Sequence, residues 1–260
     1  MLPMRRLVKF LLERTADVWS RGVGYSFPAK YTWRWKLDVL AERYEPETTK
    51  LFKEIVGTGM TVVDIGAHIG YFTRLAANRV GPTGHVYAFE ADTENINYLR
   101  ANTNRFPQVT VTNAAVSSRD GTVDFYHVNE STGLHSIFKP ERPAKHFSVV
   151  AVSIDSFVSR NRIPHIDVIK MDIEGGESDA LEGMSRTIAQ EHLSIIMEWN
   201  PPALKRANAQ PEELISKLFA AGFSLSVIGD AARIPFSKED MQPIHQHFDH
   251  TGSVNIFAVK

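Results

Sequence analysis

The segment from Thr61 to Gly70, TVVDIGAHIG, restricts the fold of this chain more than any other feature. A short β-branched run ends in Asp64, two glycines four residues apart follow (Gly66 and Gly70), and a second apolar run ends in Glu90. In an open parallel sheet, ligands bind beyond the carboxyl ends of the strands, where glycines let the backbone approach them. The pattern therefore predicts two neighbouring strand ends that share one ligand.

The alternation of strand and helix continues along the chain. From about Glu45 onward, short β-branched runs alternate with segments of helical character, which is typical of βαβ units around a mostly parallel sheet. The expected strands are Met60 to Ile65, His85 to Glu90, Val109 to Val116, Asp167 to Ile173, Leu193 to Trp199, Ser224 to Ile228 and Ser253 to Val259. The expected helices are Tyr71 to Arg79, Thr93 to Arg105, Glu177 to Gln190 and Pro211 to Ala221. We therefore expect an α/β fold with a main domain at residues 46–260 and an N-terminal helical and aromatic extension at residues 1–45.

Two intervals interrupt this rhythm. Asp120-Gly121 precedes the alternating run TVDFYHV, which predicts a hairpin or cap inserted at about residues 117–150. The stretch from Asp230 to Gly252 is rich in Pro, His and charged residues and is expected to be irregular. We expect substrate specificity to lie in these two intervals and in the N-terminal extension.

The composition excludes several classes of protein. The formal net charge of −1 gives no global attraction to nucleic acid, so no nucleic-acid partner is expected. The absence of cysteine excludes disulfides and thiolate chemistry and agrees with a cytoplasmic location. No run approaches the roughly 18 apolar residues of a membrane-spanning helix.

The N-terminal residues allow two interpretations. A helix over this segment places four apolar residues near one face: Leu7, Phe10, Leu11 and Val18. Such a face predicts an amphipathic helix docked on the core. The segment also carries basic residues, Arg5, Arg6, Lys9 and Arg14. They leave peripheral membrane contact as the alternative.

The motifs that the glycine turn lacks exclude some of its possible ligands. A dinucleotide fingerprint needs glycines at the positions of His68 and Tyr71, and the Gly-Lys-Ser/Thr run of a P-loop does not follow. Glu90 would accept hydrogen bonds from a ribose diol but would repel a phosphate. These features favour S-adenosylmethionine over NAD or ATP. The structural alternative is a tight turn, followed by an acid that only caps the next helix.

Several blocks of the sequence together resemble the FkbM family of S-adenosylmethionine-dependent methyltransferases. They are VVDIGAHIGYFT, YAFEAD with NYLRANTNR after it, TVTNAAVSSRDGTVDF, SIDSFV and DVIKMDIEGGESDALEGM, and they cover about Thr58 to Asn200. The resemblance implies a Rossmann-like class I methyltransferase fold, in which a seven-stranded, mostly parallel sheet has helices on both faces and an antiparallel final strand. It also implies O-methylation, in relatives largely of sugar or polyketide-type hydroxyls.

The same resemblance implies where the cofactor binds. The first strand end and the glycine turn would hold its methionine part, the second strand end its ribose and the third strand end its adenine. The residues at these positions are Asp64, Gly66, Ala67, His68, Gly70, Glu90, Ala91, Asn113, Ala114 and Ala115. The family usually has Asn where this chain has His68.

The reaction also needs a group that takes up the proton of the acceptor, because a sugar hydroxyl is a weak acid. The run KMDIEGGE ends the fourth expected strand beside the cofactor, and its Asp172 is the expected base. Glu174 and Glu177 lie in the same run, and Glu177 would either act at the site or only start the next helix. Lys170 would either pair with Asp172 or be a satisfied, partly buried lysine. His135, in the inserted segment, is a further candidate base. Nearby Ser131, Thr132 and Ser136 would orient a polar acceptor.

The next strand ends in SIIMEWN, which brings Glu198 and Asn200 beside Asp172. Three oxygen ligands from two neighbouring strand ends could hold Mg²⁺, which would lower the pKa of the acceptor hydroxyl. The alternative is direct proton transfer to a protein base. The catalytic candidates are therefore Asp172, His135 and Glu198.

Two clusters of ring side chains border the expected site. The run HQHFDH contains His245, His247 and His250, and its spacing favours a surface loop or a rim of the acceptor site over a zinc site. The aromatic residues of the extension are Tyr25, Tyr31, Trp33 and Trp35. They would dock this segment on the core or stack on a sugar.

The function expected from these features is methyl transfer to a hydroxyl of a saccharide, glycolipid or secondary metabolite. An RNA or protein methyltransferase and a catalytically silent cofactor-binding interaction module remain the alternatives. A homo-oligomer is compatible with each of these functions.

Overall fold

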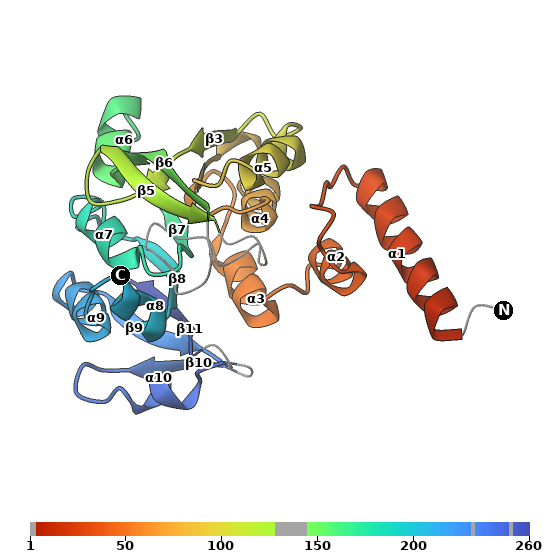
Figure 1. Cartoon of the computed structure of the whole chain (residues 1–260). Coiled ribbons are helices and arrows are strands. Elements are labelled where there is room, and N and C mark those ends of the chain that lie inside the picture. Colours follow the sequence, from red (N-terminus) through yellow and green to blue (C-terminus); the bar gives the residue numbers. More distant parts are fainter. Residues whose placement is uncertain (1–3, 128–144, 230–231, 250–251) are drawn as a thin grey trace.

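The computed structural model of this chain describes residues 4–127, 145–229, 232–249 and 252–260 (Figure 1). Two sheets and their surrounding helices make up the described part, and α1 (Met4–Gly22) lies at its outer edge (Figure 1). None of the helices in the described ranges is long and apolar enough to cross a membrane.

The larger sheet is mostly parallel. Its eight strands are, in spatial order, β10 (Arg233–Phe236), β9 (Ser224–Ile228), β11 (Val254–Val259), β8 (Ser194–Trp199), β7 (Val168–Met171), β1 (Thr61–Ile65), β2 (His85–Glu90) and β3 (Val109–Asn113). The strands from β8 to β3 pair in parallel, whereas β11 is antiparallel to both of its neighbours. The α/β fold with an antiparallel final strand is thus confirmed.

The sheet contains one more strand than the seven expected. Part of the interval from Asp230 to Gly252, expected to be irregular, forms β10 and the short helix α10 (Gln242–Gln246). β10 pairs antiparallel with β9 at the edge of the sheet. Its Pro235 has no N–H to donate, which an edge strand tolerates and a central strand does not.

Helices cover both faces of the larger sheet. Residues of α3 (Pro46–Ile55), α4 (Tyr71–Val80) and α5 (Asn95–Thr103) pack on one face, and residues of α6 (Ile154–Asn161), α7 (Glu177–Glu182), α8 (Pro201–Arg206) and α9 (Pro211–Ala220) pack on the other. A short 3₁₀ helix, η1 (Gly81–Thr83), follows α4. Successive residues of a strand point to opposite faces, so Val62 packs with the first group and Val63 with the second.

The smaller sheet holds the inserted hairpin. Its order is β4 (Ala115–Val116), β6 (Lys145–Val152) and β5 (Gly121–His127). β5 and β6 pair antiparallel, in the interval where a hairpin or cap is expected after Asp120-Gly121. The single strand expected from Val109 to Val116 is wrong, because the chain leaves β2 after Asn113 and pairs with β6 instead.

The helix expected from Glu177 to Gln190 ends at Glu182. Beyond Gly183, the carboxylate of Asp155 accepts hydrogen bonds from the backbone N–H groups of Arg186 and Thr187. These bonds hold the chain in turns rather than in a continued helix. The helix expected from Thr93 to Arg105 is also shorter, because α5 spans Asn95–Thr103.

The N-terminal extension is anchored to the core through α4. The buried guanidinium of Arg74 donates to the carbonyl oxygens of Val23, Gly24 and Asn102 at 2.7 to 3.0 Å. The extension continues as α2 (Trp33–Leu40), and α1 packs beside α2 rather than on the sheet (Figure 1). The expected docked face of α1 is therefore wrong: Phe10, Leu11 and Val18 are exposed.

Candidate active site

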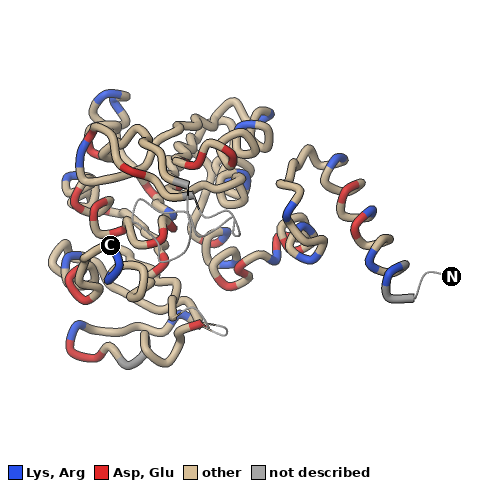
Figure 2. The backbone as a smooth tube through the Cα atoms, in the orientation of Figure 1, with Lys and Arg blue, Asp and Glu red and all other residues tan. Residues whose placement is uncertain are grey.

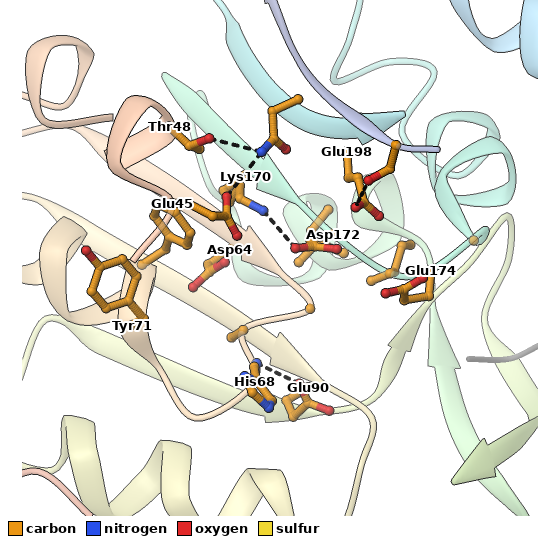
Figure 3. Close-up of a pocket in the computed structure, with 18 of the residues that line it drawn as sticks. Glu45, Thr48, Asp64, His68, Tyr71, Glu90, Lys170, Asp172, Glu174 and Glu198 are labelled. Carbon is orange, nitrogen blue, oxygen red and sulfur yellow. Dashed lines mark hydrogen bonds and ion pairs between the residues drawn. The ribbon is translucent and has the colours of Figure 1, made fainter. Parts of the chain in front are cut away.

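A cavity of about 800 Å³ opens at the carboxyl ends of the central strands. Its walls come from the ends of β1, β2, β7 and β8, from the start of β4 and from the N-terminal extension. This is the place where an open parallel sheet binds its ligand. Figure 3 shows His68 and Glu90 on one side of the cavity and the carboxylates of Asp172, Glu174 and Glu198 on another.

The glycine turn packs tightly against the end of β7. Gly66 has φ +81°, and a Cβ added to it would lie 1.9 Å from the carbonyl oxygen of Asp172. A side chain at this position would therefore push the two strand ends apart. Gly70, at φ +93°, would meet Leu99 in the same way, and it is not among the described residues that line the cavity.

His68 occupies the centre of this turn in a left-handed conformation, with φ +55°. Asn and His both tolerate this region better than most residues, which explains how His stands where the family has Asn. The backbone N–H of His68 donates to Glu90 Oε2 at 2.7 Å. Its side chain makes a different contact, in which Nε2 lies 2.6 Å from the hydroxyl of Tyr31.

Asp64 is buried at the end of β1 and lines the cavity. Its Oδ2 accepts a hydrogen bond from the hydroxyl of Thr73 at 2.5 Å. Burial raises the pKa of Asp64 to about 6, although the bond from Thr73 and the charge of Lys170 oppose the shift. A carboxylate at this depth can hold a cationic group of a ligand.

Glu90 is buried at the end of β2. Its two oxygens accept the backbone N–H groups of His68 and Asp92, at 2.7 and 2.8 Å. Burial raises the pKa of Glu90 to about 7 despite these bonds. A carboxylate has about four acceptor positions, so two stay available for the hydroxyls of a ribose.

The end of β3 contributes differently from what the sequence indicates. Ala91, Ala114 and Ala115 line the cavity with Ala67, and they offer a smooth apolar wall. Asn113 is not among the described lining residues, and its amide donates to the carbonyl oxygens of Glu90 and Ala91. Asn113 thus holds the loop after β2 in place from behind the wall.

The end of β7 presents a buried ion pair to the cavity. Lys170 Nζ lies 3.2 Å from Asp172 Oδ2, and the lysine is 2% exposed. Burial lowers the pKa of Lys170, but the carboxylates of Asp172, Glu45 and Asp64 outweigh this effect and raise it. The charged lysine therefore fixes the orientation of Asp172 (Figure 3).

Three carboxyl groups converge beside this pair. Oxygens of Asp172, Glu174 and Glu198 all lie within 4.8 Å of one another. Burial and the neighbouring carboxylates raise the pKa of Glu174 to about 9, and burial and Asp172 also raise the pKa of Glu198. Glu198 Oε1 accepts from the hydroxyl of Ser253 at 2.7 Å, whereas its buried Oε2 has no hydrogen-bond partner among the described residues.

Asn200 is not among the described residues that line the cavity. Its Oδ1 accepts the backbone N–H of Ala203 at 3.0 Å and so caps α8. The oxygen that Asn200 was expected to offer beside Asp172 and Glu198 is thus engaged in this cap. Glu174, which has a left-handed backbone with φ +53° in the loop after β7, is the third member of the carboxyl cluster.

Glu177 stabilises the loop after β7. It is fully buried, and its carboxylate accepts the backbone N–H groups of Ile173 and Gly175 at 3.2 and 3.0 Å. Burial raises its pKa to about 7. These bonds shape the loop that carries Asp172 and Glu174.

Some cavity residues, such as Glu45, carried no functional signal in the sequence, whereas Trp35 was expected to dock the extension on the core or to stack on a sugar. Glu45 precedes α3 with φ +42°, and its Oε2 accepts from Asn255 Nδ2 at 3.2 Å. Burial raises the pKa of Glu45, and the charge of Lys170 opposes the shift. Trp35 and Tyr44 of the extension also line the cavity, with their ring centroids 5.4 Å apart. Only long-range contacts bring these residues to the strand ends.

The other candidates have mixed outcomes. His247 and Asp249 line the cavity, which supports the interpretation of HQHFDH as a rim. His245 is exposed and packs against Phe248. His250 and the group His135, Ser131, Thr132 and Ser136 lie outside the described residues.

The sheet, with its antiparallel final strand, and the helices on both of its faces have the Rossmann-like class I methyltransferase fold. A sequence profile described as the methyltransferase FkbM domain matches residues 64–225. The chain belongs to the FkbM methyltransferase family.

Two relatives are similar to part of the chain. The hexuronic acid methyltransferase AglP of Haloferax volcanii is 23% identical over 156 residues, which are 59% of this chain and 62% of that protein. The 2-O-methyltransferase NoeI of Sinorhizobium fredii is 25% identical over 144 residues, which are 50% of this chain and 59% of that protein. The matches thus span about three fifths of the length of these relatives.

A solved structure is similar to the whole fold. The O-methyltransferase from Bacillus cereus in complex with SAH has a TM-score of 0.52 and 14% sequence identity, with 96% of this chain and 90% of that chain covered. At this identity the likeness concerns the fold.

Proposed function

We propose that this chain transfers the methyl group of S-adenosylmethionine to a hydroxyl of a saccharide, glycolipid or related small molecule. The observation that carries the proposal is the position of Asp172. Its backbone touches the glycine turn at Gly66, and its side chain borders the cavity. A proton acceptor is thus present beside the place where the methyl donor would lie. The names of AglP and NoeI, which state methylation of hexuronic acid and 2-O-methylation, support a sugar as acceptor.

The cofactor would lie along the ends of β1 and β2 and the start of β4. In this arrangement Asp64 is near the amino group of its methionine part, Glu90 accepts the ribose hydroxyls, and Ala114 and Ala115 contact the adenine. The support is the burial of both acids and the apolar wall beside Glu90. Buried carboxylates that face a ligand form strong, charge-assisted hydrogen bonds.

Methyl transfer would be an in-line displacement. The acceptor oxygen forms a bond to the methyl carbon while the bond from that carbon to sulfur breaks, which leaves S-adenosylhomocysteine and a methyl ether. The proton of the acceptor hydroxyl passes to the carboxylate of Asp172, with Glu198 as the second acid within reach. A positioned base of this kind contributes about 100-fold to 10,000-fold in rate.

A cation-assisted variant of the reaction is the second candidate. The convergence of Asp172, Glu174 and Glu198 within 4.8 Å favours it, because oxygen ligands suit Mg²⁺. Such an ion would lower the pKa of the acceptor hydroxyl. Turnover that is lost in EDTA and restored by Mg²⁺ would support this variant. Turnover that is indifferent to EDTA would leave direct proton transfer.

The test is a methylation assay with a panel of acceptors. Purified protein is incubated with S-adenosylmethionine and with uronic acids, neutral glycosides, RNA or protein, and products are identified by mass spectrometry. The proposal predicts a mass increase of one methylene on saccharides. Methylation of RNA or protein alone would contradict it, as would binding of S-adenosylhomocysteine without turnover on any acceptor.

A further inference from the structure

Helix α1 exposes most of the large apolar side chains found on the surface of the described part. Of the six large hydrophobic residues that are exposed there, five lie in α1: Val8, Phe10, Leu11, Val18 and Trp19. Their exposure ranges from 41% for Trp19 to 68% for Val18. Single apolar residues on a surface are ordinary, whereas a contiguous group of them marks an interaction site.

Four of these residues form one stripe along the helix, and Phe10 lies outside it. Val8, Leu11, Val18 and Trp19 follow each other at helical spacing, with Thr15 in the middle. Residues three and four positions apart lie next to each other on a helix surface. Val8, Leu11, Val18 and Trp19 therefore lie on one face of the helix, which only Thr15 interrupts.

The contact with α2 uses a different face of α1. Ala16 and Ser20 are buried, and Asp17 pairs with Lys36 of α2 at 3.0 Å. The side of α1 that meets the protein thus carries small and polar residues, while the large apolar residues face away from it. Figure 1 shows α1 at the edge of the molecule, where nothing in the described part covers this outer face.

The same helix is basic, in contrast to the chain as a whole. It holds five basic and two acidic residues, a net charge of +3, whereas the chain has −1. Both acids are paired, Glu13 with Lys9 and Asp17 with Lys36. Basic residues recur along the length of α1 (Figure 2).

Two of the arginines border the apolar stripe. Arg14 lies three residues after Leu11 and four before Val18, and Arg21 lies three residues after Val18. Both are exposed. Apolar residues flanked by arginines on an exposed helix have the chemistry of a helix that lies in the interface of an anionic bilayer.

We propose that α1 docks this protein on an anionic membrane surface, with Val8, Leu11, Val18 and Trp19 in the lipid interface and Arg14 and Arg21 at the lipid headgroups. A second copy of the chain fits the charges less well, because two copies of α1 that met through their apolar stripes would bring their arginines together. Repulsion between like charges opposes that contact, while anionic lipid is attracted. This docking does not depend on which acceptor the cavity methylates.

The test measures partition of the full chain onto vesicles. The protein is mixed with vesicles of phosphatidylcholine, with or without phosphatidylserine, and the bound fraction is measured by flotation. The native protein is expected to bind the vesicles that contain phosphatidylserine. The double variant Leu11→Asp/Val18→Asp should bind these vesicles at least about tenfold more weakly, because it places charges in the interface. Arg14→Gln/Arg21→Gln should bind these vesicles about tenfold more weakly, because it removes the contacts with the lipid headgroups.

A matched control is Val150→Asp on β6, where the native valine is 59% exposed and lies outside α1. This variant should bind vesicles as the native protein does. The affinity of each variant for S-adenosylhomocysteine reports that the methyltransferase fold is intact, and it also separates failure of docking from failure of the cavity.

Two outcomes would overturn the proposal. One is a native protein that ignores anionic vesicles or binds neutral ones equally well. The other is a native dimer, seen by light scattering, that the Leu11→Asp/Val18→Asp variant dissociates, since a second copy would then cover the stripe. If the gentler variant Leu11→Asn/Val18→Asn binds vesicles like the native protein, the stripe has no part in binding.

Discussion

The hydroxyl of Tyr31 lies 2.6 Å from Nε2 of His68. This contact joins the N-terminal extension to the turn that carries the cofactor motif. The backbone of the same histidine donates to Glu90, so the extension, the turn and the end of β2 form one hydrogen-bonded unit. Residues outside the sequence block that marks the family thus take part in shaping the proposed cofactor site.

Removal of the Tyr31 hydroxyl should weaken cofactor binding while leaving the fold in place. In Tyr31→Phe, His68 loses a partner that steadies the turn, and a neutral hydrogen bond of this kind contributes about 1 kcal/mol. We expect the Kd for S-adenosylhomocysteine to rise by about fivefold in calorimetry. Tyr98→Phe on α5, which is not among the lining residues, is the control. Equal affinity in Tyr31→Phe and the native protein would remove the proposed link.

The backbone of His68 should matter more for folding than its ring. His68→Asn keeps a residue that tolerates φ +55°, so its free energy of unfolding should stay within about 1 kcal/mol of the native value. His68→Val places a β-branched residue in the left-handed region and should cost about 1 to 3 kcal/mol. Urea unfolding at neutral pH measures both. Equal stability of the two variants would contradict this account of the turn.

Cofactor affinity should depend on pH through Glu90. Burial raises the pKa of Glu90 to about 7, and only the ionised carboxylate accepts two ribose hydroxyls. Affinity is therefore expected to be full above pH 7 and to fall by up to about tenfold per unit below it. Glu90→Gln should bind the cofactor about 10-fold to 100-fold more weakly at pH 8, and its affinity should change less with pH.

Any dependence of affinity on pH that remains in Glu90→Gln would come from other acids in the cavity. The first candidate is Asp64, because its pKa of about 6 lies close to that of Glu90. The control is Glu94→Gln, an exposed residue before α5. An identical pH profile for native protein and Glu90→Gln would exclude Glu90 as the ribose acceptor.

The parallel part of the fold was predictable from the sequence because it depends on local pattern. The parallel strand His85–Glu90 has bounds that match its apolar run, and so has the antiparallel strand Ser224–Ile228. The break between β3 and β4 had no local signal, because it results from pairing with β6, which is distant in sequence. Helix α1 also shows the limit of pattern: its amphipathic period predicted docking, yet the apolar face is turned outward.

The residues of the site can likewise be divided into those that the local pattern predicts and those that it does not. Asp64, Glu90 and Asp172 end apolar strands, so their convergence follows from parallel topology alone. Glu45 and Trp35 reach the cavity through the packing of the extension, which no periodicity reveals. The position of Glu174 depends on a left-handed backbone in the loop after β7, where the sequence gives only the following Gly175 as a hint.

The stability of the ligand-free protein should rise when Glu174 is neutralised. Burial and the nearby acids raise the pKa of Glu174 to about 9 from its ordinary 4.5, so the folded state keeps a proton that the unfolded state has lost. Stability therefore falls as pH rises from about 4.5 toward 9. Glu174→Gln should be more stable than the native protein at pH 8 by about 1 to 3 kcal/mol, and the difference should shrink at pH 5.

Urea unfolding at the two pH values checks this expectation. Glu182→Gln, an exposed acid on α7, serves as the control and should change little. A Glu174→Gln variant that is less stable than the native protein at pH 8 would mean that the carboxylate has a favourable partner in the fold.

The role of Asp172 is the central claim, and the most direct measurement compares binding and turnover in Asp172→Asn. Asparagine keeps the shape of the side chain and cannot accept the proton of the hydroxyl. We predict a Kd for S-adenosylhomocysteine within about threefold of the native value and methylation of a saccharide acceptor that is about 100-fold to 10,000-fold slower. Turnover equal to that of the native protein, with intact cofactor binding, would contradict the assignment of Asp172 as the base.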